Sequence, residues 1–295
     1  MRYLVIIFLF GMLLLCRNNA TGQVIHSGQN IALKNKVGLN AFSFNKLLSA
    51  DSIDIFGLLD YSSDLGFDGV DLTGYYFKGY PEPPSDEYIY SVKKRAFKLG
   101  LDICGTGVKN DFCNPDAEVR KQTIELTKKW ILVAQKLGAP AIRVFQGSET
   151  SPNHSWDEMA GWVSDAIREC ADFGKQHGVM IEVQNHNSFL KTAKDVHRIM
   201  EMIDHEWVGL MLDIGSYRTA DPYKDIEETI QYAISWQLKE NVFVNGERRE
   251  VDLEKIKRII LNSEYKGYLP IETLGEGDPY KKVDKFYRDI IEILK

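Results

Sequence analysis

Residues 181–187 read Ile-Glu-Val-Gln-Asn-His-Asn, an apolar strand pattern that ends in four polar residues. Similar stretches, each after an amphipathic helix pattern, occur at 209–215 (GLMLDIG), 234–240 (ISWQLKE) and 268–273 (YLPIET). In a barrel of parallel strands, the carboxyl ends of the strands meet at one mouth, where enzymes of this architecture place their chemistry. The four stretches therefore predict a barrel whose mouth is lined by polar side chains from distant parts of the chain.

Strand and helix patterns alternate from residue 37 to the end of the chain. The predicted strands are 37–44, 69–73, 102–108, 141–145, 179–184, 208–213, 233–239 and 267–272, and the predicted helices include 53–65, 85–99, 114–137, 156–176, 192–203, 252–261 and 279–294. With a further helix opening at 221, these patterns predict eight strand–helix units and thus a single (β/α)8 TIM barrel domain over 37–295. An open doubly wound sheet is the competing fold. It would usually show a Gly-rich phosphate turn after the first strand, and this chain has none there.

The first 22 residues have the features of an export signal peptide. A positive charge precedes an apolar run at 4–15, and residues 20–22 (Ala-Thr-Gly) match a small-x-small cleavage pattern. The run is shorter than the roughly 20 residues that a membrane span needs. We therefore expect cleavage after residue 22, an N-terminal extension at 23–36, and an exported protein, which is periplasmic if the source is bacterial. Lipoprotein anchoring through Cys16 is less favoured, because the residue before it is bulkier than the lipoprotein peptidase usually accepts.

Charge and composition limit the classes of partner. The formal net charge is −6, and no dense run of Lys and Arg suggests a surface for nucleic acid. The sequence also lacks a Walker A loop, a Gly-x-Ser-x-Gly elbow and a His-Glu-x-x-His helix. Cys104 and Cys113 could pair or remain small buried thiols. We expect a small-molecule partner, no nucleic acid and no stable membrane span in the mature chain, and the sequence leaves open a homo-oligomer.

Two acidic residues at strand ends are the leading candidates for chemistry. Asp213 ends an apolar strand before Ile214-Gly215, and Glu272 ends the last strand with apolar neighbours on both sides. An ionised carboxylate in such surroundings must be paired, solvated or bound to a metal. Two of them at one mouth can hold a divalent cation or divide acid and base roles. The alternatives are a loop-capping Asp213 and a structural ion pair at Glu272.

Alternation along the strands places further polar residues on the same faces. Gln184 and His186 share one face, so we expect Gln184 to offer an oxygen ligand or an amide donor, and His186 to act on the substrate. Gln237 and Lys239 likewise share a face, and a lysine there can polarise a carbonyl or stabilise an enolate. The alternatives are a plain polar turn and a surface Lys239 paired with its neighbour. The expected substrate-binding residues are Asn185, Asn187, Arg143, Glu240 and Lys109.

The chain resembles the xylose isomerase-like barrel superfamily, in particular its sugar phosphate isomerase/epimerase branch. The resemblance covers nearly all of the chain after the predicted signal peptide. It rests on the stretches 178–186, 211–213, 237–240 and 270–273. Their order and spacing are fairly specific for the superfamily and weak for any one substrate.

The resemblance implies a divalent metal, often Mn or Mg, held by four strand-end ligands: Glu, Asp, His and Glu. Carried over position by position, the ligands here would be Gln184, Asp213, Gln237 and Glu272, so two of the four are neutral amides. Amide oxygens can ligate hard cations but bring no formal charge, and we therefore expect a weak Mn or Mg site. Glu182 offers another carboxylate, although it stands two residues before the matching position.

The resemblance also implies a reaction. Epimerases of the superfamily use two metal-bound Glu residues, and Gln184 at the first position argues against a two-base mechanism. We expect an enzyme that abstracts a proton next to a carbonyl of a carbohydrate, with Glu272 as base and Lys239 or His186 stabilising the enediolate. The alternatives are a keto-glycoside lyase or hydratase, a catalytically silent carbohydrate-binding barrel, and an apurinic-site endonuclease. The last would need more His residues than this mouth offers.

Overall fold

The computed structural model describes residues 35–147 and 153–295, and within them a set of parallel strands closes into a barrel. Around the barrel the strands are β1 (Val37–Asn40), β10 (Leu269–Glu272), β7 (Ala233–Lys239), β6 (Val208–Asp213), β5 (Met180–Gln184), β4 (Ala141–Val144), β3 (Asp102–Gly107) and β2 (Gly69–Thr73). This confirms the predicted (β/α)8 fold. The predicted signal peptide at 1–22, with Cys16, lies outside the described residues.

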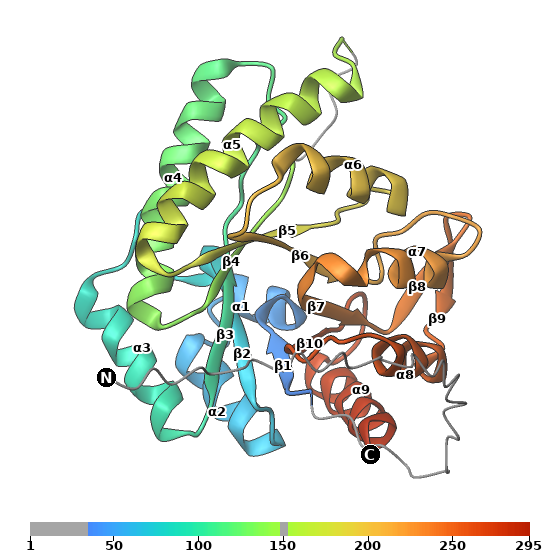
Figure 1. Ribbon diagram of the computed structural model, residues 1–295. Helices are drawn as coiled ribbons and strands as arrows, with labels where there is room; N and C mark the ends of the chain where they lie inside the picture. Colours follow the sequence, from blue (N-terminus) through green and yellow to red (C-terminus); the bar gives the residue numbers. More distant parts are fainter. Residues whose placement is uncertain (1–34, 148–152) are drawn as a thin grey trace, which may run out of the picture. The chain divides into compact units, whose positions relative to one another are not determined.

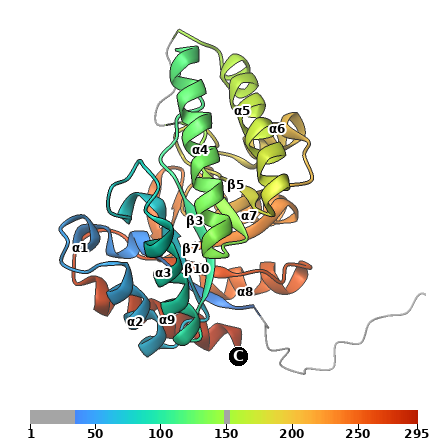
Figure 2. The ribbon, with the colours of Figure 1, turned by 90° about the vertical axis from the view of Figure 1, so that its left-hand side faces the viewer.

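Helices surround the strands, as Figures 1 and 2 show. They are α1 (Asn45–Ser49), α2 (Ile55–Leu65), α3 (Asp86–Lys98), α4 (Ala117–Leu137), α5 (Trp156–His177), α6 (Ala193–Ile203), α7 (Pro222–Thr229), α8 (Leu253–Asn262) and α9 (Pro279–Leu294). An Asp, Ser or Thr side chain accepts a backbone N–H at the start of each helix from α2 to α9. Such caps satisfy amides that the helix itself leaves unpaired, which explains why the helices start where the sequence predicts.

The hydrophobic core lies between the strands and the helices. On β5, Ile181 and Val183 belong to this core, and a side chain added at Gly174 of α5 would meet Ile181 at 3.5 Å. The alternate residues of the same strand, Glu182 and Gln184, are buried inside the barrel instead. The period-two pattern therefore separates an apolar outer face from a polar barrel interior.

Two local features differ from the simplest interpretation of the sequence. The first strand ends at Asn40 rather than at residue 44, because the Asn40 side chain accepts the N–H of Phe42 at 2.9 Å and starts a 3₁₀ turn (Ala41–Phe44). Asn245 and Gly246 form the turn of an antiparallel hairpin, β8 (Asn241–Val244) and β9 (Glu247–Glu250), which is separate from the barrel sheet. Both turn residues have positive φ, as a two-residue hairpin turn requires.

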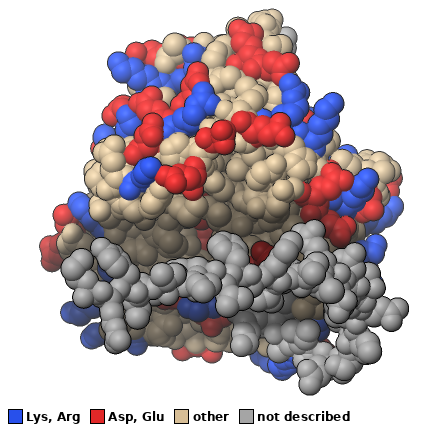
Figure 3. Space-filling model, in the orientation of Figure 1, with Lys and Arg blue, Asp and Glu red and all other residues tan. Residues whose placement is uncertain are grey.

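The described surface carries charged side chains of both signs. Acidic and basic side chains are interspersed over the face shown in Figure 3, without a large area of one sign. None of the described helices is both long and apolar enough to cross a membrane. Cys104 and Cys113 are free and buried, so the alternative of a disulfide between them is wrong.

Candidate active site

Strand order brings the four positions of the expected metal cage together. β5, β6, β7 and β10 are consecutive neighbours in the barrel. In their register Asp213 lies beside Gln237, and Glu272 lies beside Lys239. The two carboxylates that the sequence singles out therefore share one rim of the barrel.

Five side chains at this rim form a closed circuit of contacts, which we call the mouth ring: Gln184, Asp213, Gln237, Lys239 and Glu272. Gln184 Nε2 donates to Asp213 Oδ2 at 2.8 Å and to Gln237 Oε1 at 3.0 Å. Gln237 Nε2 donates in turn to Glu272 Oε2. Lys239 Nζ closes the ring, 2.8 Å from Asp213 Oδ2 and 3.1 Å from Glu272 Oε1.

The two carboxylates of the ring have different electrostatic environments. Burial acts to raise the pKa of Asp213, but the charge of Lys239 and hydrogen bonds from Lys239, Ser216 and Gln184 outweigh it and hold this pKa below its ordinary value. For Glu272, burial dominates over the same lysine and the pKa is raised. Burial disfavours the charged form of Lys239, yet both carboxylates reverse this effect and raise its pKa. Asp213 is therefore a fixed anion and Lys239 a fixed cation, while Glu272 is better suited to exchange a proton.

Asp213 is fixed by groups to which the sequence assigned no such role. Gly215 N donates to Asp213 Oδ1 at 2.9 Å, and Ser216 Oγ donates to Asp213 Oδ2 at 2.8 Å. Asn185 uses both ends of its amide on the same residue: its Oδ1 accepts Asp213 N–H at 2.7 Å, and its Nδ2 donates to Asp213 O at 2.9 Å. The structure therefore does not bring Asn185, an expected substrate-binding residue, to the open mouth; it positions Asp213.

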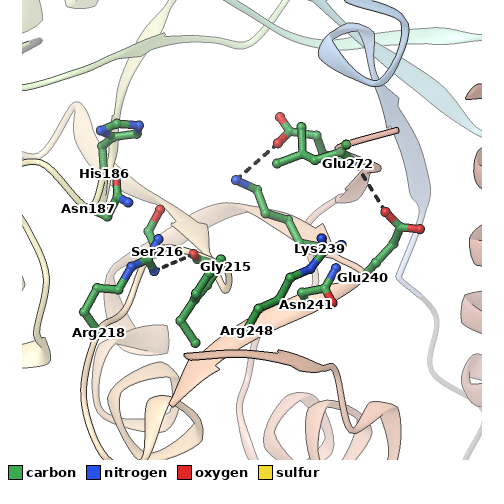
Figure 4. A pocket seen from close by; sticks show the side chains of 13 residues that line it. His186, Asn187, Gly215, Ser216, Arg218, Lys239, Glu240, Asn241, Arg248 and Glu272 are labelled. Atoms are coloured by element: carbon green, nitrogen blue, oxygen red, sulfur yellow. Dashed lines mark hydrogen bonds and ion pairs between the residues drawn. The ribbon is translucent and has the colours of Figure 1, made fainter. Parts of the chain in front are cut away.

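A cavity of about 300 Å³ opens above the ring. Figure 4 shows Lys239 and Glu272 on one side of it and His186 with Asn187 on the other. Glu240 also lines this cavity, where it pairs with Lys282 at 3.2 Å. Its wall further contains Ser216, Arg218, Asn241, Phe243 and Arg248. Nothing in the sequence pattern marked these wall residues.

A second hollow, of about 160 Å³, shares Lys239, Glu272 and His186 with the first. Arg143 lines it together with aromatic residues, and the Arg143 guanidinium carbon lies 4.1 Å from the centroid of the Phe145 ring. Arg143 Nη1 also donates to Val108 O at 3.0 Å. The Arg143 guanidinium carbon lies 5.9 Å and the Lys109 Nζ 5.1 Å from the centroid of the Tyr75 ring. Lys109 itself lines a separate hollow with Phe145 and His186.

His186 lies where these hollows meet. Its Nδ1 is 3.0 Å from Ser188 Oγ, and its ring packs edge-on against Phe145 with centroids 5.2 Å apart. Burial lowers the pKa of His186. The neutral imidazole is thus favoured near pH 7 and can offer either a donor or an acceptor to a bound molecule.

A second pair of acidic residues lies deeper in the barrel. Burial raises the pKa of Glu182 to about 8 and that of Asp71 to about 6. Ser235 Oγ donates to Glu182, and Asn40 Nδ2 donates to Asp71 at 2.8 Å. Glu182 is therefore hydrogen-bonded to Ser235 below the mouth ring and does not replace Gln184 at the mouth.

The fold and the polar mouth define a TIM barrel with an enzyme-like site. Residues 59–294 match the family described as xylose isomerase-like TIM barrel. The chain belongs to this family, which confirms the predicted superfamily.

Individual relatives are distant. The 3-keto-D-glucoside 4-epimerase of E. coli has 17% identity and a TM-score of 0.68, covering 89% of this chain and 98% of that structure. A xylose isomerase-like TIM barrel protein of Mycobacterium smegmatis in complex with magnesium has 16% identity and a TM-score of 0.65, covering 88% and 96%. A probable endonuclease 4 of Acholeplasma laidlawii is 22% identical over 185 residues, which are 59% of this chain and 62% of that relative. The chain thus spans about three-fifths of this curated relative, and the structural likenesses show the fold.

Proposed function

We propose that the protein is an enzyme that removes a proton next to a carbonyl of a carbohydrate and so isomerises or epimerises it. The observation that carries this proposal is the contact of Lys239 Nζ with Glu272 Oε1, 3.1 Å apart at the floor of an open cavity. A base of raised pKa thereby stands beside a fixed cation where a small sugar can enter. Membership in a superfamily that includes a keto-sugar epimerase supports the same reaction class.

In the proposed reaction, Glu272 takes the proton from the carbon next to the carbonyl. The electron pair of the broken C–H bond forms an enediolate, and its oxygen accepts a hydrogen bond from Lys239. For an isomer, Glu272 returns the proton to the former carbonyl carbon, while the proton of the adjacent hydroxyl passes to the former carbonyl oxygen and the carbonyl re-forms one carbon along. For an epimer, the enediolate turns its opposite face to Glu272, which then returns the proton to the original carbon. His186 and Arg143 line the same hollow and bind the hydroxyls of the substrate.

The residues present fit the predicted Mn or Mg ion poorly. Within 35–147 and 153–295, no group of three or more His, Cys, Asp or Glu side chains is arranged to hold a metal ion. The ring instead has two carboxylates, and both contact the ammonium of Lys239. In the proposed reaction the charge that stabilises the enediolate therefore comes from Lys239.

The test is exchange of substrate hydrogen with solvent. Keto-sugars are incubated with the protein in D₂O, and deuterium uptake and product identity are followed by mass spectrometry and NMR. We expect Glu272→Gln to lower exchange by about 100-fold or more, the usual contribution of a general base. Glu276→Gln is the matched control, because Glu276 is exposed and pairs only with Lys46 among the described residues. Equal exchange by wild type and Glu272→Gln would refute the proposed base.

The same experiment separates the remaining functions. A keto-glycoside lyase or hydratase would release a leaving group or change the mass by one water, while an isomerase conserves mass. A catalytically silent barrel would bind sugar without exchange. The proposed export, through residues outside the described ones, would make the substrate an extracytoplasmic sugar.

A further inference from the structure

In the mouth ring, the ammonium of Lys239 pairs with the carboxylates of Asp213 and Glu272. Its two carboxylates, Asp213 and Glu272, are almost fully buried, and the Lys239 side chain between them is 15% exposed. Buried carboxylates require a cation or several donors nearby. Lys239 supplies that cation from within the chain, at 2.8 Å and 3.1 Å from the two acids.

The ring already occupies the Asp213 oxygen that a metal would need. Asp213 Oδ2 already accepts from Gln184, Ser216 and Lys239. Both Gln side chains turn an Nε2 donor toward a carboxylate, and an amide N–H₂ cannot ligate a cation. Among the described side chains, no ring atom is a buried polar atom without a partner. A dication in this ring would have to displace several hydrogen bonds and meet the charge of an ammonium.

The side chain of Lys239 lies in a space that exists because residue 215 is glycine. A side-chain carbon at Gly215 would lie only 2.6 Å from Lys239 Cδ and 3.2 Å from Asn241 O. The bare backbone at Gly215 thus lets the lysine stem cross toward the two acids. This packing, independent of the ring contacts, shows a place shaped for the lysine.

We propose that Lys239 is the resident cation of this site and takes the place of the divalent metal that the resemblance implies. An ammonium has three N–H donors, of which the two acids take one each. Lys239 also lines both hollows, so its third N–H is available to a carbonyl or enediolate oxygen of a bound substrate. The role of Lys239 in catalysis rests on the proposed function. The expectation that the site binds no divalent metal is independent of that function.

The test combines metal binding with turnover. Wild-type protein is produced with added Mn and Mg, dialysed, and analysed for metal content and for its melting temperature with Mn, Mg or EDTA. We expect substoichiometric metal and no change of melting temperature. Lys239→Met removes the charge but keeps a chain of similar length, and it should gain a Mn-dependent rise in melting temperature. Lys36→Met, which breaks an exposed pair with Asp102, is the matched control and should gain none.

The outcomes separate this inference from the proposed function. One equivalent of Mn or Mg retained by the wild type, or turnover lost with EDTA and restored by Mn, overturns the resident-cation proposal and leaves the reaction class intact. Wild type free of metal with no turnover of any keto-sugar overturns the reaction class and leaves the resident cation intact. The wild-type measurements decide the question even if Lys239→Met does not fold.

Discussion

Removal of the Asn185 amide tests how Asp213 is positioned. Asn185 and Asp213 are both fully buried, and the amide makes hydrogen bonds of 2.7 and 2.9 Å to the backbone N–H and C=O of Asp213. Each buried hydrogen bond contributes about 1 kcal/mol net, and each group left unpaired costs about 1–3 kcal/mol. For Asn185→Ala we therefore expect a loss of about 2–5 kcal/mol in the free energy of unfolding.

Urea denaturation followed by circular dichroism measures this loss, and Asn187→Ala is the matched control. Asn187 is two residues away and half-buried, and it lines the cavity. Its truncation should change stability by less than about 0.5 kcal/mol, as is usual away from buried networks. Asn185→Ala should lower kcat through a misplaced Asp213, whereas Asn187→Ala should mainly raise KM. An unfolding free energy of Asn185→Ala within 0.5 kcal/mol of wild type would refute the argument.

Three further perturbations test other parts of the site. Burial raises the pKa of Asp71 to about 6, so the folded protein prefers the protonated form of this side chain. The contribution of Asp71 to the free energy of unfolding is therefore complete below about pH 4 and is lost as the pH rises through 6. Asp71→Asn should remove up to about 3 kcal/mol of this dependence between pH 4 and 8, and urea midpoints that keep the wild-type pH profile would contradict the assignment. In Gly107→Ala, the new Cβ would lie 2.7 Å from Arg143 Nη2, so the Arg143 guanidinium must move and KM should rise. An unchanged KM together with an unchanged Arg143 in a crystal structure would count against a role of Arg143 in substrate binding. Arg248→Gln should change KM and leave stability within about 0.5 kcal/mol, because Arg248 lies on an exposed strand of the hairpin; a large loss in urea stability would show that the hairpin is structural.

The sequence predicted the barrel well because its signals are local. Apolar stretches with period-two alternation depend on a few neighbouring residues, and so do the Ser155 cap and the left-handed Gly178 that bound α5 in the structure. Strand β1 was predicted too long because Asn40 ends it through its own side chain, a competition that hydrophobicity does not reveal.

The site could be predicted only in part. That Asp213 and Glu272 meet follows from strand order, and the alternation rule placed Gln184, Gln237 and Lys239 on inner faces. The sequence pattern could not predict how far a side chain extends. Lys239 extends past Gly215 to both Asp213 and Glu272, and this position depends on packing between different strands. Asn185 shows the converse, since a polar residue at a strand end can serve the backbone of the next strand instead of a ligand.

The β8–β9 hairpin carries Phe243 and Arg248 to the cavity but shares no strand pairing with the barrel. Among its links to the site are the stacking of Arg218 on Phe243, with the guanidinium carbon 3.9 Å from the ring centroid, and a backbone hydrogen bond from Asn245 N to Thr219 O at 2.7 Å. The hairpin therefore lines the cavity without belonging to the strands that carry the mouth ring. Asn241 O lies only 3.2 Å from where a side-chain carbon at Gly215 would stand, so an exchange that keeps Asn241 and replaces 242–250 would change the cavity wall and preserve the backbone beside Lys239, which makes this segment a natural starting point for redesign.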